Sequence, residues 1–97
     1  ILVGVDTSGL VTQWNFQAEL ETGLRDKDAI GKKLTDVFPR LYSIMDNIND
    51  SMNSGRIRTC LKHEYSTKNE TRYEDIIIYP LATQEVNGVV IRMDDIT

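Results

Sequence analysis

One acidic side chain stands where it could do chemistry, in the stretch GVDTSGLVTQWN. Asp6 ends an apolar run and is followed at once by the small polar residues TSG. A carboxylate directly after a strand can act as a nucleophile on phosphorus, with a second acid to handle the proton. The same position also suits a tight turn, because an Asp side chain can accept hydrogen bonds from the amides that follow it. Asp6 is therefore either a phosphotransfer nucleophile or the residue that closes a turn.

The phosphotransfer alternative rests on a faint resemblance to the Asp-x-Asp-Gly-Thr loop of haloacid-dehalogenase-like phosphatases. In this sequence Ser8 stands where that loop has its second acid. A chain of 97 residues also leaves little room for the Mg²⁺ ligands and the lysine that such a reaction needs. We therefore interpret Asp6 as a turn residue, with Gly9 supplying positive φ, and keep a phosphotransfer enzyme as a distant alternative.

The other reactive side chains are isolated in the sequence. His63 and Cys60 are the single histidine and the single cysteine, and both fall on a predicted strand. One imidazole without partners at ligand spacing does not define a metal site, so none is predicted, and ligand contact by His63 or redox sensing by Cys60 stay as alternatives. Arg92 is the only charge in GVVIRM. It could point inward to bind a carboxylate or phosphate, but we favour an outward position, in solvent or beside Glu74 or Asp75.

Five runs of the sequence predict strands, because they are short, rich in β-branched residues and bounded by turn residues. The predicted strands are Ile1 to Asp6, Leu10 to Trp14, Arg56 to Tyr65, Arg72 to Leu81 and Val89 to Asp94. Polar turns are predicted at Lys68-Asn69 and at Asn87-Gly88. Such short connections make neighbouring strands antiparallel.

Helices are predicted between the second and third strands. Asn15 suits an N-cap and Gly23 a helix end, with a helix of about two turns between them. A further helical turn near Leu34 should end at Pro39. The longest helix is predicted over Arg40 to Asn53, where apolar residues recur at helical spacing. The predicted fold is α+β, a five-stranded antiparallel sheet with helices packed on one face.

Composition limits the partners of the chain. The net charge is −4 and the basic residues are scattered, so the chain offers no cluster for nucleic acid. The apolar runs fall short of the roughly 20 residues that span a bilayer, and no signal peptide is visible. We expect a cytoplasmic piece without membrane contact of its own. Because the chain opens on Ile1 within an apolar run, it is interpreted as a fragment of a longer multidomain protein.

A series of short motifs runs along nearly the whole chain in a recognisable order. They are Asp6-x-x-Gly9, Asn15-x-x-Ala18-Glu19-x-x-Thr22-Gly23, Gly31-Lys32, Val37-Phe38-Pro39, Tyr79-Pro80-Leu81 and Asp95-Ile96-Thr97. Together they resemble a PAS domain of the kind found in bacterial sensor histidine kinases. Residues 1–97 are accordingly interpreted as a single PAS domain.

The resemblance implies a fold, a function and an output. The strand order of the family is 2-1-5-4-3. Its members are sensory or coupling modules, not catalytic themselves and often dimeric, which pass a signal to an effector domain in the same chain. The parent implied here is a two-component sensor histidine kinase. The family's signalling junction corresponds to Asp95, Ile96 and Thr97.

The resemblance also bears on cofactors. Haem-binding relatives usually supply an axial histidine from the long helix, and the predicted helix over Arg40 to Asn53 has none. Flavin-binding relatives carry an Asn-Cys-Arg motif on a helix after the second strand, whereas Cys60 lies on the third predicted strand. Neither haem nor flavin is therefore expected.

Two functions remain open from the sequence. In the first, a small, mostly apolar ligand binds between the long helix and the sheet. The expected contacts are Ile44, Ile48, Met52, Ile57, Ile77 and Ile91. In the second, the chain is a ligand-free module that dimerises and relays a signal, with its own side chains filling the interior. A homodimer is expected in either case.

Overall fold

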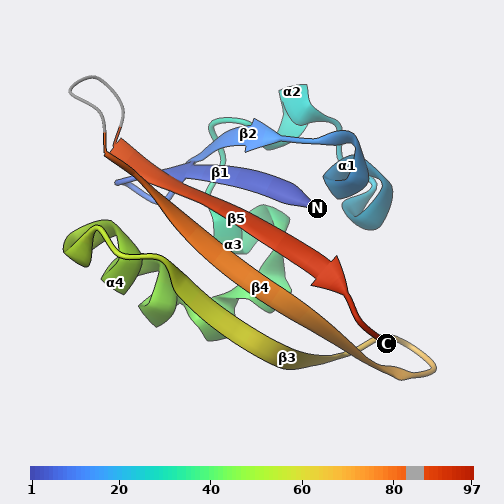
Figure 1. Cartoon of the computed structure of the whole chain (residues 1–97). Coiled ribbons are helices and arrows are strands. Elements are labelled where there is room, and N and C mark those ends of the chain that lie inside the picture. Colours follow the sequence, from blue (N-terminus) through green and yellow to red (C-terminus); the bar gives the residue numbers. More distant parts are fainter. Residues whose placement is uncertain (83–86) are drawn as a thin grey trace.

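The computed structural model describes residues 1–82 and 87–97, which form one antiparallel sheet and a set of helices (Figure 1). The strands are β1 (Leu2–Asp6), β2 (Val11–Trp14), β3 (Arg58–Ser66), β4 (Thr71–Ala82) and β5 (Asn87–Asp95). Their order in the sheet is β2-β1-β5-β4-β3, and every neighbouring pair is antiparallel. The predicted five-stranded α+β fold and its strand order are confirmed.

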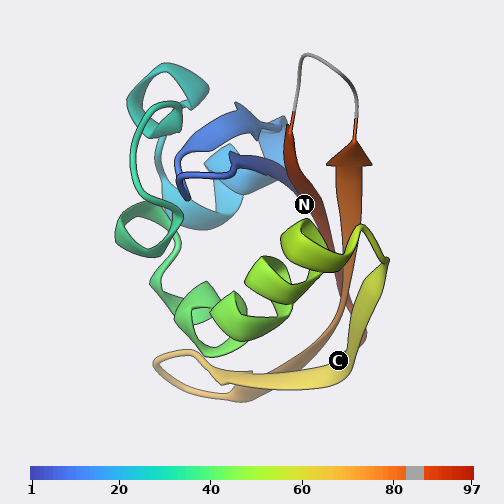
Figure 2. The same ribbon diagram turned by 90° about the vertical axis from the view of Figure 1, so that its left-hand side faces the viewer.

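Helices connect β2 to β3 and cover one side of the sheet (Figure 2). They are α1 (Phe16–Thr22), α2 (Asp26–Ala29), α3 (Leu34–Val37), the 3₁₀ helix η1 (Pro39–Ile44) and α4 (Met45–Ser54). Within the described part of the chain, none of these helices combines the length and apolar character needed to cross a membrane.

The hairpin between β1 and β2 is closed by Asp6. Its Oδ1 accepts hydrogen bonds from the amides of Ser8, at 2.9 Å, and Leu10, at 3.0 Å. Gly9 takes a φ of +82°, a region that side chains disfavour, and donates its amide to the Asp6 carbonyl. The Asp6 carboxylate is thus occupied by the turn itself.

Helix α1 has a cap at each end. Asn15 Oδ1 accepts from the amide of Ala18 at 3.0 Å, and Gly23, with φ +76°, donates its amide to the Glu19 carbonyl. These bonds satisfy backbone groups that a helix end leaves unpaired. They fix where α1 begins and ends, and so how it lies beside the sheet.

The helix predicted over Arg40 to Asn53 is wrong in its first half. Residues from Pro39 to Ile44 form the tighter 3₁₀ helix η1, and only α4 is an α-helix. Leu41 and Ile44 are both buried, and a 3₁₀ helix with three residues per turn places residues three apart on one face. The apolar spacing that indicated one α-helix is therefore shared by a 3₁₀ helix and the α-helix that follows it.

The core lies between the sheet and the helices. Strand β4 contributes Ile76 and Ile78, which are fully buried, and α4 contributes Ile48. The other buried apolar residues come mainly from β1, β5 and η1: Val3, Val5, Val89, Ile91, Met93, Leu41 and Ile44. This packing leaves the alternate residues of the central strands on the opposite face of the sheet.

Three sequence-based placements need correction. Ile57 precedes β3 and is 57% exposed, because β3 begins one residue later, at Arg58. Ile77 is on the face of the sheet away from α4, since alternation along β4 turns its neighbours Ile76 and Ile78 inward. The turn predicted at Asn87-Gly88 is also wrong, because both residues pair with β4 within β5.

Gly88 is required by the close approach of two strands. A β-carbon at this position would lie 2.2 Å from the carbonyl oxygen of Val5 on β1. That oxygen belongs to the backbone, so no side-chain rotation can relieve the clash. We expect Gly88→Ala to lower the free energy of unfolding by about 2–3 kcal/mol, measured by denaturant unfolding.

Gly9→Ala is the matched control for this prediction. Gly9 has positive φ, but a β-carbon there meets nothing within 4 Å. The expected loss is about 1 kcal/mol, from backbone conformation alone. Equal losses in the two variants would show that the approach to Val5 does not constrain Gly88.

Candidate functional site

A bulge in β3 decides which of its side chains face the interior. Cys60 pairs with Ile76 and His63 with Glu74, so β3 has one residue more than β4 between these two pairs. Lys62 absorbs the difference with a φ of +55°, and its amide donates to Asp75 Oδ1 at 2.9 Å. The extra residue reverses the alternation, and His63 as well as Cys60 is partly buried.

His63 meets a buried acid on β4. Glu74 is 2% exposed, and its Oε2 lies 3.0 Å from His63 Nδ1. The other ring nitrogen, Nε2, lies 2.9 Å from the hydroxyl of Ser43 on η1. The imidazole therefore connects β4 to the 3₁₀ helix through both nitrogens.

The same acid holds an arginine. Arg40 Nη2 donates to Glu74 Oε1 at 2.9 Å, and Arg40 Nε donates to Glu74 Oε2 at 3.2 Å. This two-point geometry is the strong form of an arginine–carboxylate pair. The third nitrogen, Nη1, donates to Glu21 on α1 at 2.7 Å. We call Arg40, Glu74, His63, Ser43 and Glu21 the Arg40 cluster.

Two aromatic rings enclose the guanidinium of Arg40. Its central carbon lies 4.7 Å from the ring centre of Phe38 and 4.0 Å from that of Tyr65, both within cation–π range. Phe38 in turn packs edge-on against Trp14, with ring centres 5.9 Å apart, and the Trp14 indole donates to the Leu24 carbonyl. The rings and Glu74 together fix the arginine head group.

The charge state of the cluster follows from these contacts. Burial lowers the pKa of Arg40, but the hydrogen bonds and negative charges of Glu74 and Glu21 outweigh it and leave the pKa above its usual value. Burial raises the pKa of Tyr65, a change that Arg40 partly opposes. Arg40 is therefore a permanent cation, and Tyr65 a neutral phenol at physiological pH.

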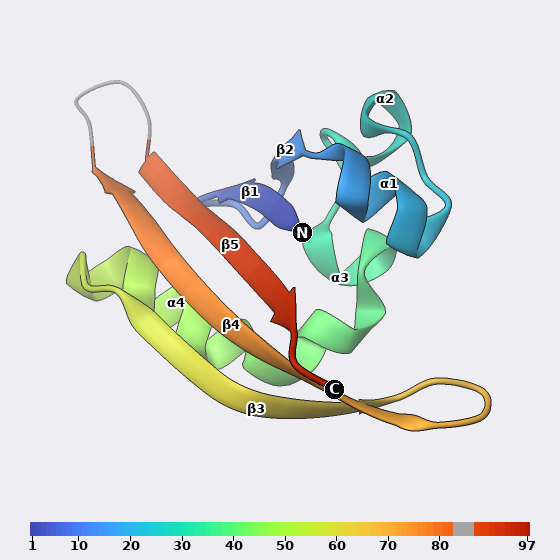
Figure 3. The same cartoon turned by 45° about the vertical axis from the view of Figure 1, so that its right-hand side comes forward.

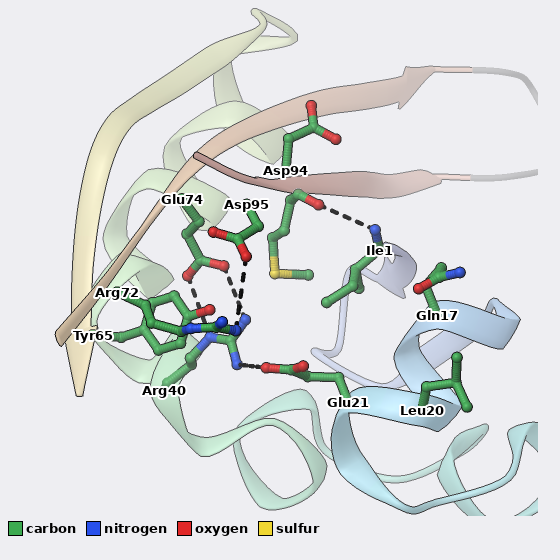
Figure 4. Close-up of a pocket in the computed structure, with 11 residues that line it drawn as sticks. Ile1, Gln17, Leu20, Glu21, Arg40, Tyr65, Arg72, Glu74, Asp94 and Asp95 are labelled. Carbon is green, nitrogen blue, oxygen red and sulfur yellow. Dashed lines mark hydrogen bonds and ion pairs between the residues drawn. The ribbon is translucent and has the colours of Figure 1, made fainter. Parts of the chain in front are cut away.

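An open pocket of about 460 Å³ adjoins the Arg40 cluster (Figure 4). Arg40, Glu74 and Tyr65 lie on one side of it, and Gln17 and Leu20 of α1 lie across from them. The remaining lining residues are Ile1, Glu21, Arg72, Met93, Asp94 and Asp95. A smaller pocket of about 240 Å³ shares Glu21 and Arg40 with it, so their ion pair lies at the border of both.

The C-terminal triplet is bonded to β4 beside this pocket, near the end of the β3–β4 hairpin (Figure 3). Thr97 Oγ1 accepts from the amide of Tyr73 at 3.0 Å, and the Ile96 amide donates to the Tyr73 carbonyl. Asp95 Oδ1 accepts from the Thr97 amide at 2.9 Å, and its Oδ2 lies 3.7 Å from Arg72 Nη1. We call these contacts the C-terminal junction.

Comparison with known proteins identifies the fold. Residues 1–96 match the family model described as the PAS fold. The chain belongs to the PAS family. No sequence among the curated proteins matches it.

Solved structures of PAS domains resemble the chain along its whole length. The PAS domain of the histidine kinase ThkA superposes with a TM-score of 0.81 at 23% identity, over 97% of this chain and 96% of that one. A sensory box sensor histidine kinase from Vibrio cholerae gives 0.77 at 14%, over 99% and 81%. The PAS domain of the quorum-sensing receptor RpfR of Cronobacter turicensis, in complex with C12:0, gives 0.70 at 18%, over 100% and 93%. At these identities the similarity concerns the fold.

The six residues expected to contact a ligand do not form one wall of this PAS domain. Ile44, Ile48 and Ile91 are buried in the core, and Met52 packs against its edge. Ile57 and Ile77 lie elsewhere, as described above. Neither of the two pockets includes any of the six residues. Ile48 of α4 belongs to the same buried apolar cluster as Ile76 and Ile78 of the sheet.

Arg92 and Cys60 lie outside the site. Arg92 is exposed, with Nε 3.0 Å from Asp94 Oδ2, so it points outward and pairs along its own strand. Cys60 Sγ accepts from Asn47 Nδ2 at 3.1 Å, and burial raises the pKa of its thiol. A protonated, partly buried thiol is a poor nucleophile.

Sequence reasoning missed the Arg40 cluster. Ligand contact by His63 was kept only as an alternative, and Arg40 was given no role. One signal was present: Glu74 has the same parity along β4 as Ile76 and Ile78, so alternation places a charge among core residues. A buried carboxylate requires a partner, and the nearest charged residues along the sequence do not supply it.

Proposed function

We propose that the chain is the PAS sensor module of a signal-transduction protein, most simply a sensor histidine kinase, which relays the state of its pocket through the C-terminal junction. One observation carries this proposal: Asp95 both lines the pocket and holds Thr97 in the junction. A ligand in the pocket would therefore contact the residue that positions the C-terminal junction. The proposal is tested in a full-length parent by removing the Asp95 carboxylate and measuring whether output still follows the stimulus.

The strength of the junction suits a switch. Its hydrogen bonds lie at the exposed end of the sheet, and bonds of this kind contribute about 0.5–1.5 kcal/mol each. A ligand needs only a modest preference for one arrangement of such a junction to shift its population. The buried core, by contrast, would resist the same perturbation.

Both functions left open by the sequence remain candidates for the input. The pocket beside the Arg40 cluster supports a small-molecule ligand, and the RpfR relative was solved in complex with C12:0. The buried apolar cluster beneath α4 favours the ligand-free alternative, in which a homodimer relays a signal from its partner. Native mass spectrometry of the purified protein separates them: a retained small molecule favours the sensor, and a clean apo dimer favours the relay.

No coloured cofactor is expected in this PAS domain. The sole histidine, His63, has Nδ1 and Nε2 directed at Glu74 and Ser43, so neither nitrogen is free to ligate haem iron. Cys60 lies on β3 with a thiol whose pKa is raised by burial, which opposes formation of a flavin adduct. Absorption spectra of purified protein should show neither a haem nor a flavin band near equimolar ratio, and either band would contradict this.

The junction should persist in mild acid. The Thr97 amide donates a hydrogen bond to Asp95 and holds the pKa of its carboxyl below the usual value. A group whose pKa is lowered on folding contributes stability above its unfolded pKa and loses it as the pH falls through the folded value. The amide resonance of Thr97 should therefore keep its position from pH 7 to pH 5 and move only below about pH 4. Movement between pH 7 and pH 5 would contradict this.

A further inference from the structure

Arg40 bonds to a buried carboxylate through two of its nitrogens and to a partly exposed carboxylate through the third. Glu74 takes Nε and Nη2 from the buried side, whereas Nη1 points to the pocket and donates to Glu21. Glu74 is buried, but the side chain of Glu21 is 35% exposed. The two carboxylates therefore bind the same cation in different environments.

The position of Arg40 does not depend on Glu21. The two-point pair with Glu74 and the rings of Phe38 and Tyr65 fix the guanidinium plane on three sides. A guanidinium held in advance loses little conformational freedom when a further anion binds to it. If Glu21 left, Nη1 would remain directed at the pocket as an unpaired donor.

Glu21 itself is weakly retained. It lies on α1, a helix of seven residues, and within the described part of the chain its carboxylate bonds only to Arg40. Exposed ion pairs of this kind change equilibria by only a few-fold. A carboxylate from another molecule could therefore replace it at small cost.

We propose that the pocket binds a small monocarboxylate, whose anionic group takes the place of Glu21 on Arg40 Nη1. This inference rests on the proposed sensor function and names its ligand class. Leu20, Ile1 and Met93 supply the apolar part of the lining, which suits a short alkyl chain. In the absence of ligand, the Glu21 carboxylate occupies the same anion site at Arg40 Nη1.

The charges around the pocket favour a monoanion. Its charged lining residues are the acids Glu21, Glu74, Asp94 and Asp95 and the bases Arg40 and Arg72. Asp95 stays in the junction when Glu21 is displaced. A phosphate dianion would meet about twice the repulsion from these carboxylates that a monocarboxylate meets. A single planar carboxylate also matches the group that occupies Nη1 in the structure.

The direct test is an NMR titration of the 97-residue chain at pH 7 with hexanoate, hexanamide and inorganic phosphate. Hexanoate should move the Nε–Hε resonance of Arg40 in a saturable way, with a dissociation constant of about a millimolar. Hexanamide and phosphate should bind at least about tenfold more weakly than hexanoate. Hexanamide has no negative charge, and the phosphate dianion has a second charge that the acidic lining repels. Equal binding of hexanamide or phosphate, or a stationary Arg40 resonance, would overturn the proposal.

The variant Glu21→Gln gives a second test, with an outcome that a purely structural role for Glu21 would not produce. Removing the internal carboxylate should tighten hexanoate binding by about threefold, the factor that an exposed ion pair provides. The control is Glu64→Gln, which removes the same charge from an exposed residue of β3 and should leave the affinity unchanged. Weaker binding in Glu21→Gln, or the same change in both variants, would overturn the proposal.

These binding experiments are independent of signal output. If hexanoate does not bind while junction variants still uncouple the parent, the ligand class is wrong and the relay stands. If hexanoate binds as described while junction variants signal normally, the relay is wrong and the anion site stands. Failure of the ligand proposal and failure of the relay proposal therefore give different experimental results.

Discussion

Replacing Arg40 with methionine should destabilise the domain by about 3–5 kcal/mol, the usual effect of removing one partner from a buried ion pair. Methionine keeps much of the arginine stem, so the loss falls on the charge. Glu74, 2% exposed, would be left with His63 as its remaining partner. For a domain of this size the loss corresponds to a fall in melting temperature of roughly 15–30 °C, measurable by calorimetry.

A double variant separates lost charge pairing from lost packing. In Arg40→Met with Glu74→Leu, both charges are gone and apolar groups of similar size remain. Buried pairs replaced in this way are often neutral in stability, so the double variant should recover most of the loss. A double variant as unstable as Arg40→Met alone would show that Arg40 stabilises the fold by packing against Phe38 and Tyr65 and not through Glu74.

Asp95→Ala in a full-length parent should uncouple output from stimulus without unfolding the PAS domain. The carboxylate holds the Thr97 amide at 2.9 Å and lies 3.7 Å from Arg72, and Thr97 is the residue that bonds to Tyr73. Its loss frees the exposed junction and leaves the core intact. A change of about 1–2 kcal/mol between two arrangements of the junction alters their ratio about 5–30-fold.

The measurement is stimulus-dependent output, such as autophosphorylation of a histidine kinase parent, at equal protein level. Asp36→Ala is a suitable control, because it removes the same charge from an exposed position away from the junction. Output from Asp95→Ala that follows the stimulus as in the unaltered protein would reduce the triplet to the end of β5. Loss of output in both variants would point to a general effect of charge.

Local features of this PAS domain were predictable because their partners are close in sequence. Asp6 bonds to amides two and four residues away, and Asn15 to an amide three residues away. Residue type and spacing describe such contacts almost completely. The strand order came from the resemblance to the family, since turns and alternation indicate pairing only between consecutive strands.

The boundaries of the elements were less predictable. Strand β3 begins two residues later than predicted, at Arg58, which leaves Ile57 outside the sheet. Pairing with β4 brings Asn87 and Gly88 into β5, and Gly88 also pairs with β1. Which face Ile77 occupies also follows from the sheet, because either face of a run of three isoleucines is apolar. These outcomes depend on the strands and helices that each strand packs against and not on its own composition.

The sequence by itself determined the five strands, the caps of α1, the closed turn at Asp6 and membership in an α+β class. Tertiary structure alone decided the Arg40 cluster, for two physical reasons. Arg40 and Glu74 are 34 residues apart, so no local pattern reports their contact. His63 reaches Glu74 only because the bulge at Lys62 reverses the alternation of β3, and that bulge is held by Asp75 on the neighbouring strand.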